Sequence, residues 1–237
     1  EIDDIADEKD LEKKVKLKQI SIWEKKINLI FKEKQLNDSL SKELFEAVSK
    51  FGLKKSNFIS IIQGMKMDII EDIKFPSKKK FDLYCDRVAV AVGYISINIF
   101  GINSSEGRNY ALNLGRAFQI TNIVRDFKED ANRSRCYVPI NYLKKYKIKK
   151  NLKDLCNSSE LNLILQELLE EANSYFSKSN KISLKLDSNK IKASETMKLF
   201  YETIHQKMYK KKINLDKKIK LNFFEKLKIF IKIILRG

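Results

Sequence analysis

The segment NYALNLGRAFQITNIVRDFKED, residues 109–130, reads as one long α-helix with a polar face. Gln119, Asn122, Asp126 and Asp130 stand at offsets 0, 3, 7 and 11 along it, and such offsets place side chains on one face of a helix. At a rise of about 1.5 Å per residue, these side chains form a polar ridge roughly 16 Å long. The sequence therefore predicts a long helix that carries a continuous row of polar groups.

The positions beside this ridge are apolar. Ala117, Ile120 and Val124 lie well off the polar face. This composition favours a ridge that points toward an interior cavity. A solvated helix face remains the alternative, because polar residues at helical spacing are more often exposed to water.

A second pair of aspartates occurs near the start of the sequence. Asp3 and Asp7 stand at i, i+4 in EIDDIADE, residues 1–8, so two separate helices each carry Asp-x-x-x-Asp. Facing each other, the two pairs would bracket hard divalent cations such as Mg²⁺, which complete their shell with water and phosphate oxygens. Arg125 and Arg135 could then hold a diphosphate directly. A metal–diphosphate site and two solvated helix faces are both open interpretations.

The rest of the sequence is also typical of helices. Only 7 Gly and 2 Pro occur among 237 residues, and few chain breakers favour long helices. We predict one all-α domain over residues 1–237, an up-and-down helical bundle without strand pairs. The predicted helices span residues 21–34, 39–52, 57–73, 81–101, 109–130, 159–177 and 191–210, with a bend and a short helix around Pro139.

The composition limits the classes of partner and the compartment. A net charge of +17 suits nucleic acid, an anionic membrane or phosphorylated substrates, although a general bias toward Lys, Ile and Asn gives the same charge. No nucleic-acid-binding module is recognisable, so we expect no nucleic-acid partner. Cys85, Cys136 and Cys156 lack metal-site spacing, which predicts no disulfide framework and a reducing, cytoplasmic location. No run of roughly 18–20 apolar residues and no signal peptide is visible.

Residues 223–237, FFEKLKIFIKIILRG, have the pattern of a basic amphipathic helix. Their apolar side chains share one broad face, whereas Lys226, Lys228, Lys232 and Arg236 lie elsewhere. Such a helix suits peripheral attachment to the inner face of an anionic membrane. It equally suits a terminal helix packed on the bundle. Both interpretations stay open, and the sequence does not define an oligomeric state.

Three ordered motifs resemble the squalene/phytoene synthase family. They are EIDDIADE (1–8), FDLYCDRVAVAVGYISINIFG (81–101) and ALNLGRAFQITNIVRDFKEDANRSRCYVP (111–139). The resemblance covers most of the chain and implies an all-α isoprenoid synthase fold. Within the family, LYCDRVAVAVGYISINIFG is similar to the bacterial enzymes that make presqualene diphosphate for hopanoids. Phytoene synthases more often carry a tyrosine where Asp86 stands.

The resemblance implies a Mg²⁺-dependent prenyltransferase and a set of site residues. Asp3 and Asp7 match the family's first acidic motif, and Asp126 and Asp130 match the second. Both motifs would bind Mg²⁺ bridged to the diphosphates of two prenyl diphosphate substrates. Tyr84 and Tyr137 match tyrosines near the reacting carbons. The matched substrate-binding positions are Gln119, Asn122, Arg125, Tyr201 and Lys218.

Small and short side chains on two of the helices have two interpretations. Ala89, Val92 and Gly93, with Ala111 and Gly115, could leave room for two prenyl tails in a dry cavity. They could also simply allow close packing of helices.

The resemblance implies that two farnesyl diphosphates condense head to head to presqualene diphosphate. One donor loses diphosphate, the double bond of the second attacks the allylic cation, and loss of a proton closes a cyclopropane. The alternatives are a phytoene synthase acting on geranylgeranyl diphosphate and a non-catalytic relative that serves as an assembly factor. Such relatives tend to lose the acidic motifs, which this chain keeps.

The sequence departs from the family pattern in two places. It begins at Glu1, after the arginine and the longer upstream region that the family carries, so we expect part of the N-terminus to be missing. Lys218 stands where many relatives have arginine, and lysine lacks the fork geometry of a guanidinium. No nicotinamide-binding Gly-rich motif occurs, so we expect reduction of the product to need a separate enzyme.

Overall fold

The computed structural model describes residues 2–8, 11–32, 38–70, 73–210 and 219–235. Across these ranges the chain is helical, and strand-like pairing is limited to an isolated parallel bridge between Lys74 and Cys136. The prediction of an all-α fold is confirmed. The elements are α1 (Ile2–Asp7), α2 (Lys13–Ile30), α3 (Ser39–Phe51), α4 (Lys55–Ile70), α5 (Lys78–Cys85), the π-helix η1 (Asp86–Val90), α6 (Ala91–Ile99), α7 (Ser105–Arg125), α8 (Phe127–Asn132), α9 (Ile140–Lys145), α10 (Leu152–Cys156), α11 (Leu161–Ser183), α12 (Ser188–Tyr209) and α13 (Phe223–Leu235).

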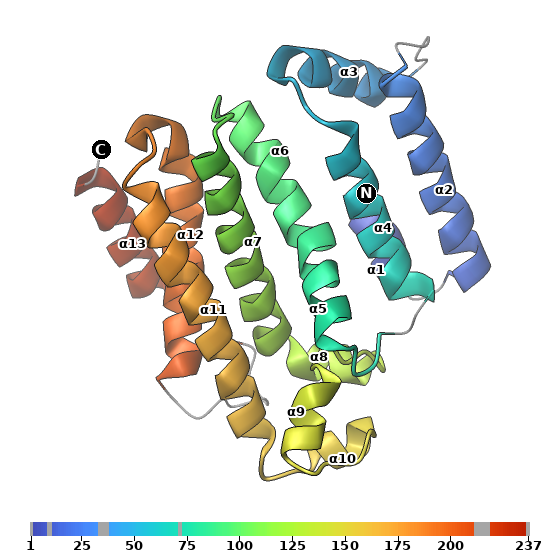
Figure 1. Cartoon of the computed structure of the whole chain (residues 1–237), viewed down its shortest axis with the longest axis vertical. Helices are drawn as coiled ribbons and strands as arrows, with labels where there is room; N and C mark the ends of the chain where they lie inside the picture. The colour runs from blue at the N-terminus through green and yellow to red at the C-terminus, as the bar shows by residue number, and fades with distance from the viewer. Residues whose placement is uncertain (1, 9–10, 33–37, 71–72, 211–218, 236–237) are drawn as a thin grey trace.

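The long helices stand side by side, with α7 near the middle of the row (Figure 1). α7 packs along α11 and against η1 and α6, and α4 packs on η1 and α2. α3 crosses one end of the row, and the short helices α8 to α10 gather at the other (Figure 1). α1 packs against α2 and α4. The N-terminal helix is therefore part of the bundle.

Local signals in the sequence set several helix ends as predicted. The Asp38 side chain accepts a hydrogen bond from the Ser41 backbone N–H and so caps α3. At the other end Gly52 has a φ of 60°, a left-handed conformation that glycine adopts without steric cost. Both signals lie within a few residues of the helix that they delimit, which is why they can be read directly from the sequence.

The prediction of one unbroken helix over residues 109–130 is wrong. α7 ends at Arg125, Asp126 has a φ of −99° and a ψ of 7°, and α8 begins at Phe127. Arg125 donates two hydrogen bonds to Asp126, at 3.0 Å from Nε to Oδ1 and 2.5 Å from Nη2 to Oδ2. Neighbouring side chains do not face each other on a regular helix. The break at Asp126 is therefore what lets the adjacent pair meet.

The predicted helix over residues 81–101 is continuous but contains a π turn. The Ala91 N–H donates to the Asp86 carbonyl oxygen, five residues earlier, so η1 holds one residue more than an α turn. A Cβ added to Gly115 on α7 would lie 2.9 Å from the Val90 Cα, so the two backbones meet there. The glycine on α7 thus makes room for the wide turn of η1.

Candidate active site

Two cavities that share part of their walls lie between α4, η1, α6 and α7. The first, called the polar cavity, has a volume of about 440 Å³ and is lined by Asp68, Asp126, Asp130, Arg133 and Arg135, among others. The second, called the apolar cavity, has a volume of about 330 Å³ and extends between α6, α7 and α12. The side chains that line both are Val88, Val92, Gln119 and Asn122. A charged space and an apolar space therefore adjoin each other across a shared wall.

The polar ridge of the sequence faces the polar cavity. Gln119, Asn122, Asp126 and Asp130 all line it, despite the break of the helix at Asp126. The apolar positions beside the ridge pack into the core, where Ala117, Ile120 and Val124 are buried. The ridge thus points into the molecule, and the interpretation as a solvated helix face is wrong for this segment.

The carboxylates of the polar cavity are poorly solvated. Burial, followed by the negative charge of Asp126, raises the pKa of Asp130 to about 7, and the Arg135 guanidinium opposes this rise. Arg125 is held by its ion pair with Asp126, and the hydrogen bonds to Asp126 raise the pKa of Arg125. When two neighbouring carboxylates are half-buried, added positive charge stabilises their ionised forms.

The N-terminal helix lies against the same end of the bundle. Arg135 Nη2 donates to the Ala6 carbonyl oxygen of α1 at 3.3 Å. Ala6 and Glu8 also line a third cavity, of about 570 Å³, together with Glu129 and Arg133 from the region of α8. This cavity shares Asp68, Arg133 and Arg135 with the polar cavity. The side chains of Asp3 and Asp7, and all of Lys218, lie outside the described residues.

The oxygen atoms of the polar cavity fit a hard divalent cation. Within the described residues no group of three or more His, Cys, Asp or Glu side chains is placed to hold a metal ion. Asp126, Asp130 and Asn122 nevertheless line one cavity, and Asn122 Oδ1 is buried without a hydrogen-bond partner. Carboxylate and amide oxygens suit Mg²⁺, which takes few protein ligands and fills its shell from water and phosphate. The residues present therefore fit part of a Mg²⁺ site.

Asp68 is a further residue of this site that was not predicted from the sequence. It is buried in the polar cavity, where the Tyr84 hydroxyl donates to its Oδ2 at 3.0 Å and the Tyr137 hydroxyl to its Oδ1 at 2.7 Å. The two tyrosine rings stack with their centroids 4.8 Å apart. In the sequence, Asp68 is a single carboxylate between Met67 and Ile69 on a largely apolar helix. A carboxylate that is buried in such a helix needs hydrogen-bond partners, so its position could have indicated a polar site.

The apolar cavity is walled by the small side chains singled out in the sequence. They are Ala89, Val92, Gly93, Ala111 and Gly115. Tyr201 also lines it and stacks on Phe118 with the ring centroids 4.0 Å apart. Because Gly115 both touches the η1 backbone and lines the cavity, close packing and free space occur together here.

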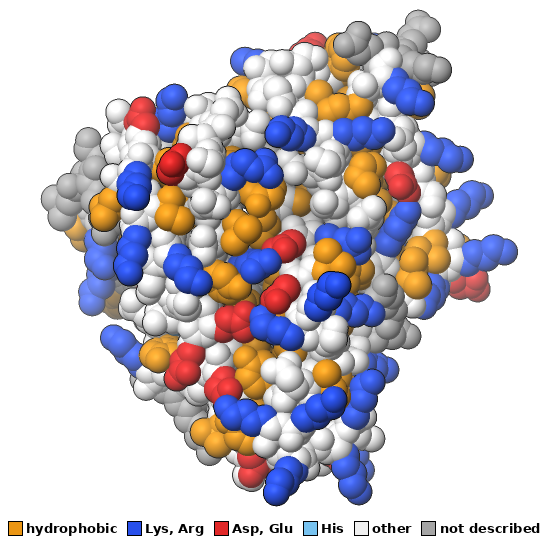
Figure 2. Space-filling view, in the orientation of Figure 1, with side chains coloured by type: hydrophobic (Ala, Val, Ile, Leu, Met, Phe, Trp, Pro, Cys, Tyr) orange, Lys and Arg blue, Asp and Glu red, His pale blue; other side chains and the backbone are white. Residues whose placement is uncertain are grey.

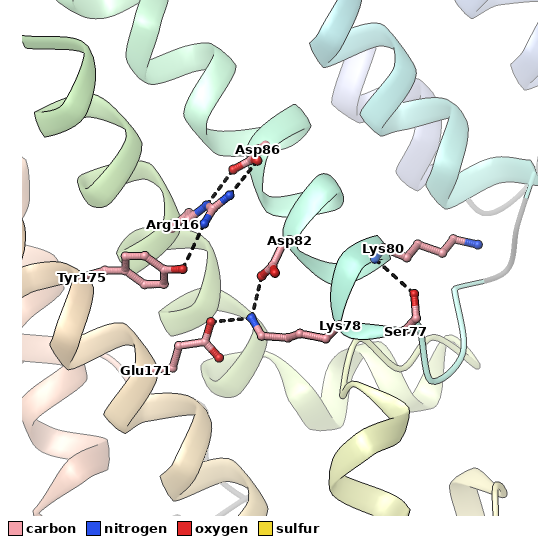
Figure 3. A network of polar contacts seen from close by, with 8 residues as sticks. All are labelled: Ser77, Lys78, Lys80, Asp82, Asp86, Arg116, Glu171 and Tyr175. Atoms are coloured by element: carbon pink, nitrogen blue, oxygen red, sulfur yellow. Dashed lines mark hydrogen bonds and ion pairs between the residues drawn. The ribbon is translucent and has the colours of Figure 1, made fainter. Parts of the chain in front are cut away.

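A network of ion pairs holds η1 from the side of α11 (Figure 3). Arg116 donates to both carboxylate oxygens of Asp86, at 2.7 and 2.8 Å, and to the Tyr175 hydroxyl at 3.0 Å. Lys78 likewise bridges Asp82 on its own helix and Glu171 on α11, at 2.5 and 2.6 Å (Figure 3). These contacts tie the helix that carries Tyr84 to α7 and α11.

Comparisons with known proteins bear on the identity of this site. A family model for squalene/phytoene synthase matches residues 1–225. Presqualene diphosphate synthase of Zymomonas mobilis subsp. mobilis is 33% identical over 88% of this chain and 71% of that protein. Phytoene synthase 2 of Oryza sativa subsp. japonica is 35% identical over a shorter part, 53% of this chain and 33% of that protein.

A solved structure supports the fold. The crystal structure of squalene synthase HpnC from Alicyclobacillus acidocaldarius matches with a TM-score of 0.78, over 88% of this chain and 78% of that chain. The sequence identity of that pair is 17%, so this match speaks for the fold alone. Because the family model spans nearly the whole chain and the Zymomonas protein is similar over most of it, the chain belongs to the squalene/phytoene synthase family.

Proposed function

We propose that this protein condenses two farnesyl diphosphates head to head to presqualene diphosphate and releases one diphosphate. The observation that carries the proposal is that the polar cavity adjoins the apolar cavity at a wall formed by Val88, Val92, Gln119 and Asn122. A prenyl diphosphate has the same division into a charged end and an apolar tail. The similarity to a presqualene diphosphate synthase over most of the chain supports the choice of product.

The polar cavity would hold the diphosphates. Asp126, Asp130 and the Asn122 amide oxygen, with Asp3 and Asp7 of α1, would hold Mg²⁺, which neutralises charge on a leaving diphosphate when it is bound. Arg133 and Arg135 line the cavity and can donate hydrogen bonds to phosphate oxygens. We therefore assign the departure of diphosphate from the first substrate to this cavity.

The apolar cavity would hold the prenyl tails and exclude water. After diphosphate departs, the double bond of the second substrate attacks the allylic cation, and loss of a proton closes the cyclopropane ring. Water would capture either cation as an alcohol, so a dry wall is required. Tyr84 and Tyr137 each donate a hydrogen bond to Asp68, and all three side chains line the polar cavity.

A product assay with two substrates tests this proposal. Incubation with farnesyl diphosphate and Mg²⁺ is expected to yield a cyclopropyl C30 diphosphate, identified by mass spectrometry before and after phosphatase treatment. Geranylgeranyl diphosphate is expected to react at least about tenfold more slowly, because its extra isoprene unit needs more apolar volume. A C40 hydrocarbon as the main product would instead assign the phytoene synthase reaction, and no turnover of either substrate would favour a non-catalytic relative.

We further propose that α13 attaches the protein to an anionic membrane surface. One face of α13 packs on the bundle, since Ile229 is 3% exposed, whereas Phe223 and Phe224 on the other face are 73% and 71% exposed. Lys226 and Lys228 on this helix are exposed as well. The two interpretations of this segment, packing on the bundle and attachment to a membrane, thus apply to different faces of one helix. No helix in the described ranges is long and apolar enough to cross a bilayer.

On the face shown in Figure 2, the described Lys and Arg side chains do not gather into one basic site. Lys and Arg side chains are scattered over the whole face shown in Figure 2, between acidic and apolar side chains. The combination of apolar and basic groups on α13 is what favours a membrane surface over a soluble anion, because interfacial helices use both.

Vesicle co-sedimentation checks the membrane proposal. Replacing Phe223 and Phe224 together with aspartate is expected to weaken binding to vesicles of anionic phospholipid by at least about tenfold, since each buried aromatic side chain contributes roughly 1.5–3 kcal/mol. Leu184→Asp is the control, because Leu184 is 87% exposed at the end of α11. Equal binding by both variants would refute the role of α13.

A further inference from the structure

The cluster of Asp68, Tyr84 and Tyr137 contains a carboxylate that is not one of the ligands proposed for the metal site. Asp68 is 8% exposed and comes from α4, Tyr84 comes from α5, and Tyr137 precedes α9. The two hydroxyls donate to different oxygens of Asp68, at 3.0 and 2.7 Å. All three side chains line the polar cavity. One buried carboxylate therefore serves two tyrosines at the place where the reaction is proposed to occur.

The chemistry of these groups fixes the direction of both hydroxyl protons. An ionised carboxylate can only accept hydrogen bonds, and a phenol has one proton to donate. Burial, followed by the charge of Asp68, raises the pKa of both tyrosines, so each keeps its proton at neutral pH. Each proton is used in the bond to Asp68. The phenol oxygens keep lone pairs on the side away from these protons, and both side chains line the cavity.

We propose that Asp68 is a positioning residue that turns the hydroxyl protons of Tyr84 and Tyr137 away from the cavity, so that a reacting carbocation meets oxygen lone pairs and aromatic faces. This inference rests on the proposed prenyl-transfer function. A hydroxyl that pointed its proton at a developing cation would oppose it, whereas oriented lone pairs and ring faces favour it. Because the bonds to Asp68 exist before substrate arrives, no reorientation is needed during the reaction.

The substitution Asp68→Asn tests the inference with almost no change in shape. An amide offers one acceptor oxygen and an N–H₂ donor in place of the second acceptor. One of the two tyrosines must then accept from the amide and release its own proton toward the cavity. We expect kcat to fall by about 10- to 100-fold with KM changed by less than about threefold, because the substrate diphosphates are bound elsewhere in the cavity. We also expect a larger share of prenyl alcohols, which form when water captures the cation.

A double-mutant comparison separates positioning from a purely structural role. If Asp68 acts through the two hydroxyls, then Asp68→Asn has no further effect on product ratio or kcat in a Tyr84→Phe/Tyr137→Phe protein. Asp82→Asn is the control, because Asp82 lies on the helix of Tyr84 but pairs with Lys78 on the side of α11 (Figure 3). It is expected to keep the wild-type kcat and product ratio.

Several outcomes would overturn the inference. A wild-type product ratio with kcat within threefold in folded Asp68→Asn would do so, as would fully additive effects in the double-mutant comparison. If Asp68→Asn does not fold, the Tyr84→Phe/Tyr137→Phe protein decides alone, and turnover within threefold of wild type counts against the inference. All variants are compared on whichever prenyl diphosphate the wild-type protein turns over, so a wrong substrate assignment appears in the wild-type assay and is distinguishable.

Discussion

Asp126→Asn is expected to reduce turnover by at least about 10³-fold while leaving the helical bundle intact. Asp126 and Asp130 line the polar cavity, one helical turn apart along the chain, and Asn122 Oδ1 lies buried there without a partner. Replacing one carboxylate with an amide keeps the volume and removes one negative charge from the proposed metal site. Less positive charge would then be held near the leaving diphosphate.

The loss should be specific to chemistry and not to folding. Asp126 is half-buried and pairs with Arg125, its neighbour in sequence, so the substitution weakens a contact that is local to the end of α7. We expect the unfolding midpoint in urea to change little relative to the fall in turnover. Asp154→Asn on α10 is the control, because this carboxylate is exposed and lies outside the polar cavity.

Measurements over a range of Mg²⁺ concentrations make the test sharper. Asp126→Asn should need more Mg²⁺ for its residual turnover than Asp154→Asn does. Wild-type turnover by Asp126→Asn, or an unchanged Mg²⁺ requirement, would contradict the assignment of Asp126 to the metal site.

The sequence predicted the fold well because its signals are local. The Asp38 cap, the left-handed Gly52 and the spacing of the ridge each depend on residues within one or two turns of each other. Helical periodicity alone also placed Gln119 and Asn122 on the face that lines the cavity. An all-α protein with few glycines offers many such signals, and tertiary contacts need not override them.

The deviations from helix geometry could not be predicted from periodicity. The break at Asp126 accompanies an ion pair between neighbours, and the π turn over η1 fits against the Gly115 backbone. The π turn depends on how η1 meets α7, and the break at Asp126 involves a side-chain pair that hydrophobic spacing does not encode. Residues 81–101 are apolar on most sides, so their hydrophobic spacing does not reveal the single inserted residue.

Asp68 was missed for a related reason. Its partners Tyr84 and Tyr137 lie 16 and 69 residues away in sequence, and only the fold brings the three side chains together. The sequence around Asp68 shows a polar residue on a largely apolar helix, but it does not show which groups donate hydrogen bonds to that residue. A buried carboxylate thus indicates that hydrogen-bond partners exist, but the sequence alone does not identify them.

The largest effect on substrate choice is expected from Ala89→Phe. Ala89 is a small, half-buried residue of η1 that lines the apolar cavity of about 330 Å³, and a phenyl ring there would occupy part of this volume. Because the ring enters existing space, we expect little loss of stability. The cavity would no longer accept the full tail of farnesyl diphosphate.

The size of the effect follows from the apolar surface that is lost. Excluding one isoprene unit removes the burial of five carbons, worth about 0.8 kcal/mol each, or about 4 kcal/mol in total. This corresponds to roughly a 10³-fold fall in kcat/KM for farnesyl diphosphate. Geranyl diphosphate, which is one unit shorter, should lose far less, so the ratio of the two kcat/KM values should shift toward the shorter substrate.

The ratio of the kcat/KM values for farnesyl and geranyl diphosphate distinguishes a filled cavity from a general loss of activity. A variant that is partly unfolded loses activity on both substrates equally, whereas a filled cavity discriminates between them. Ala47→Phe is the control, because Ala47 is also half-buried but lies on α3, apart from both cavities. An unchanged ratio in Ala89→Phe would mean that the prenyl tails occupy another space, and the pair of adjoining cavities would no longer support the proposed function.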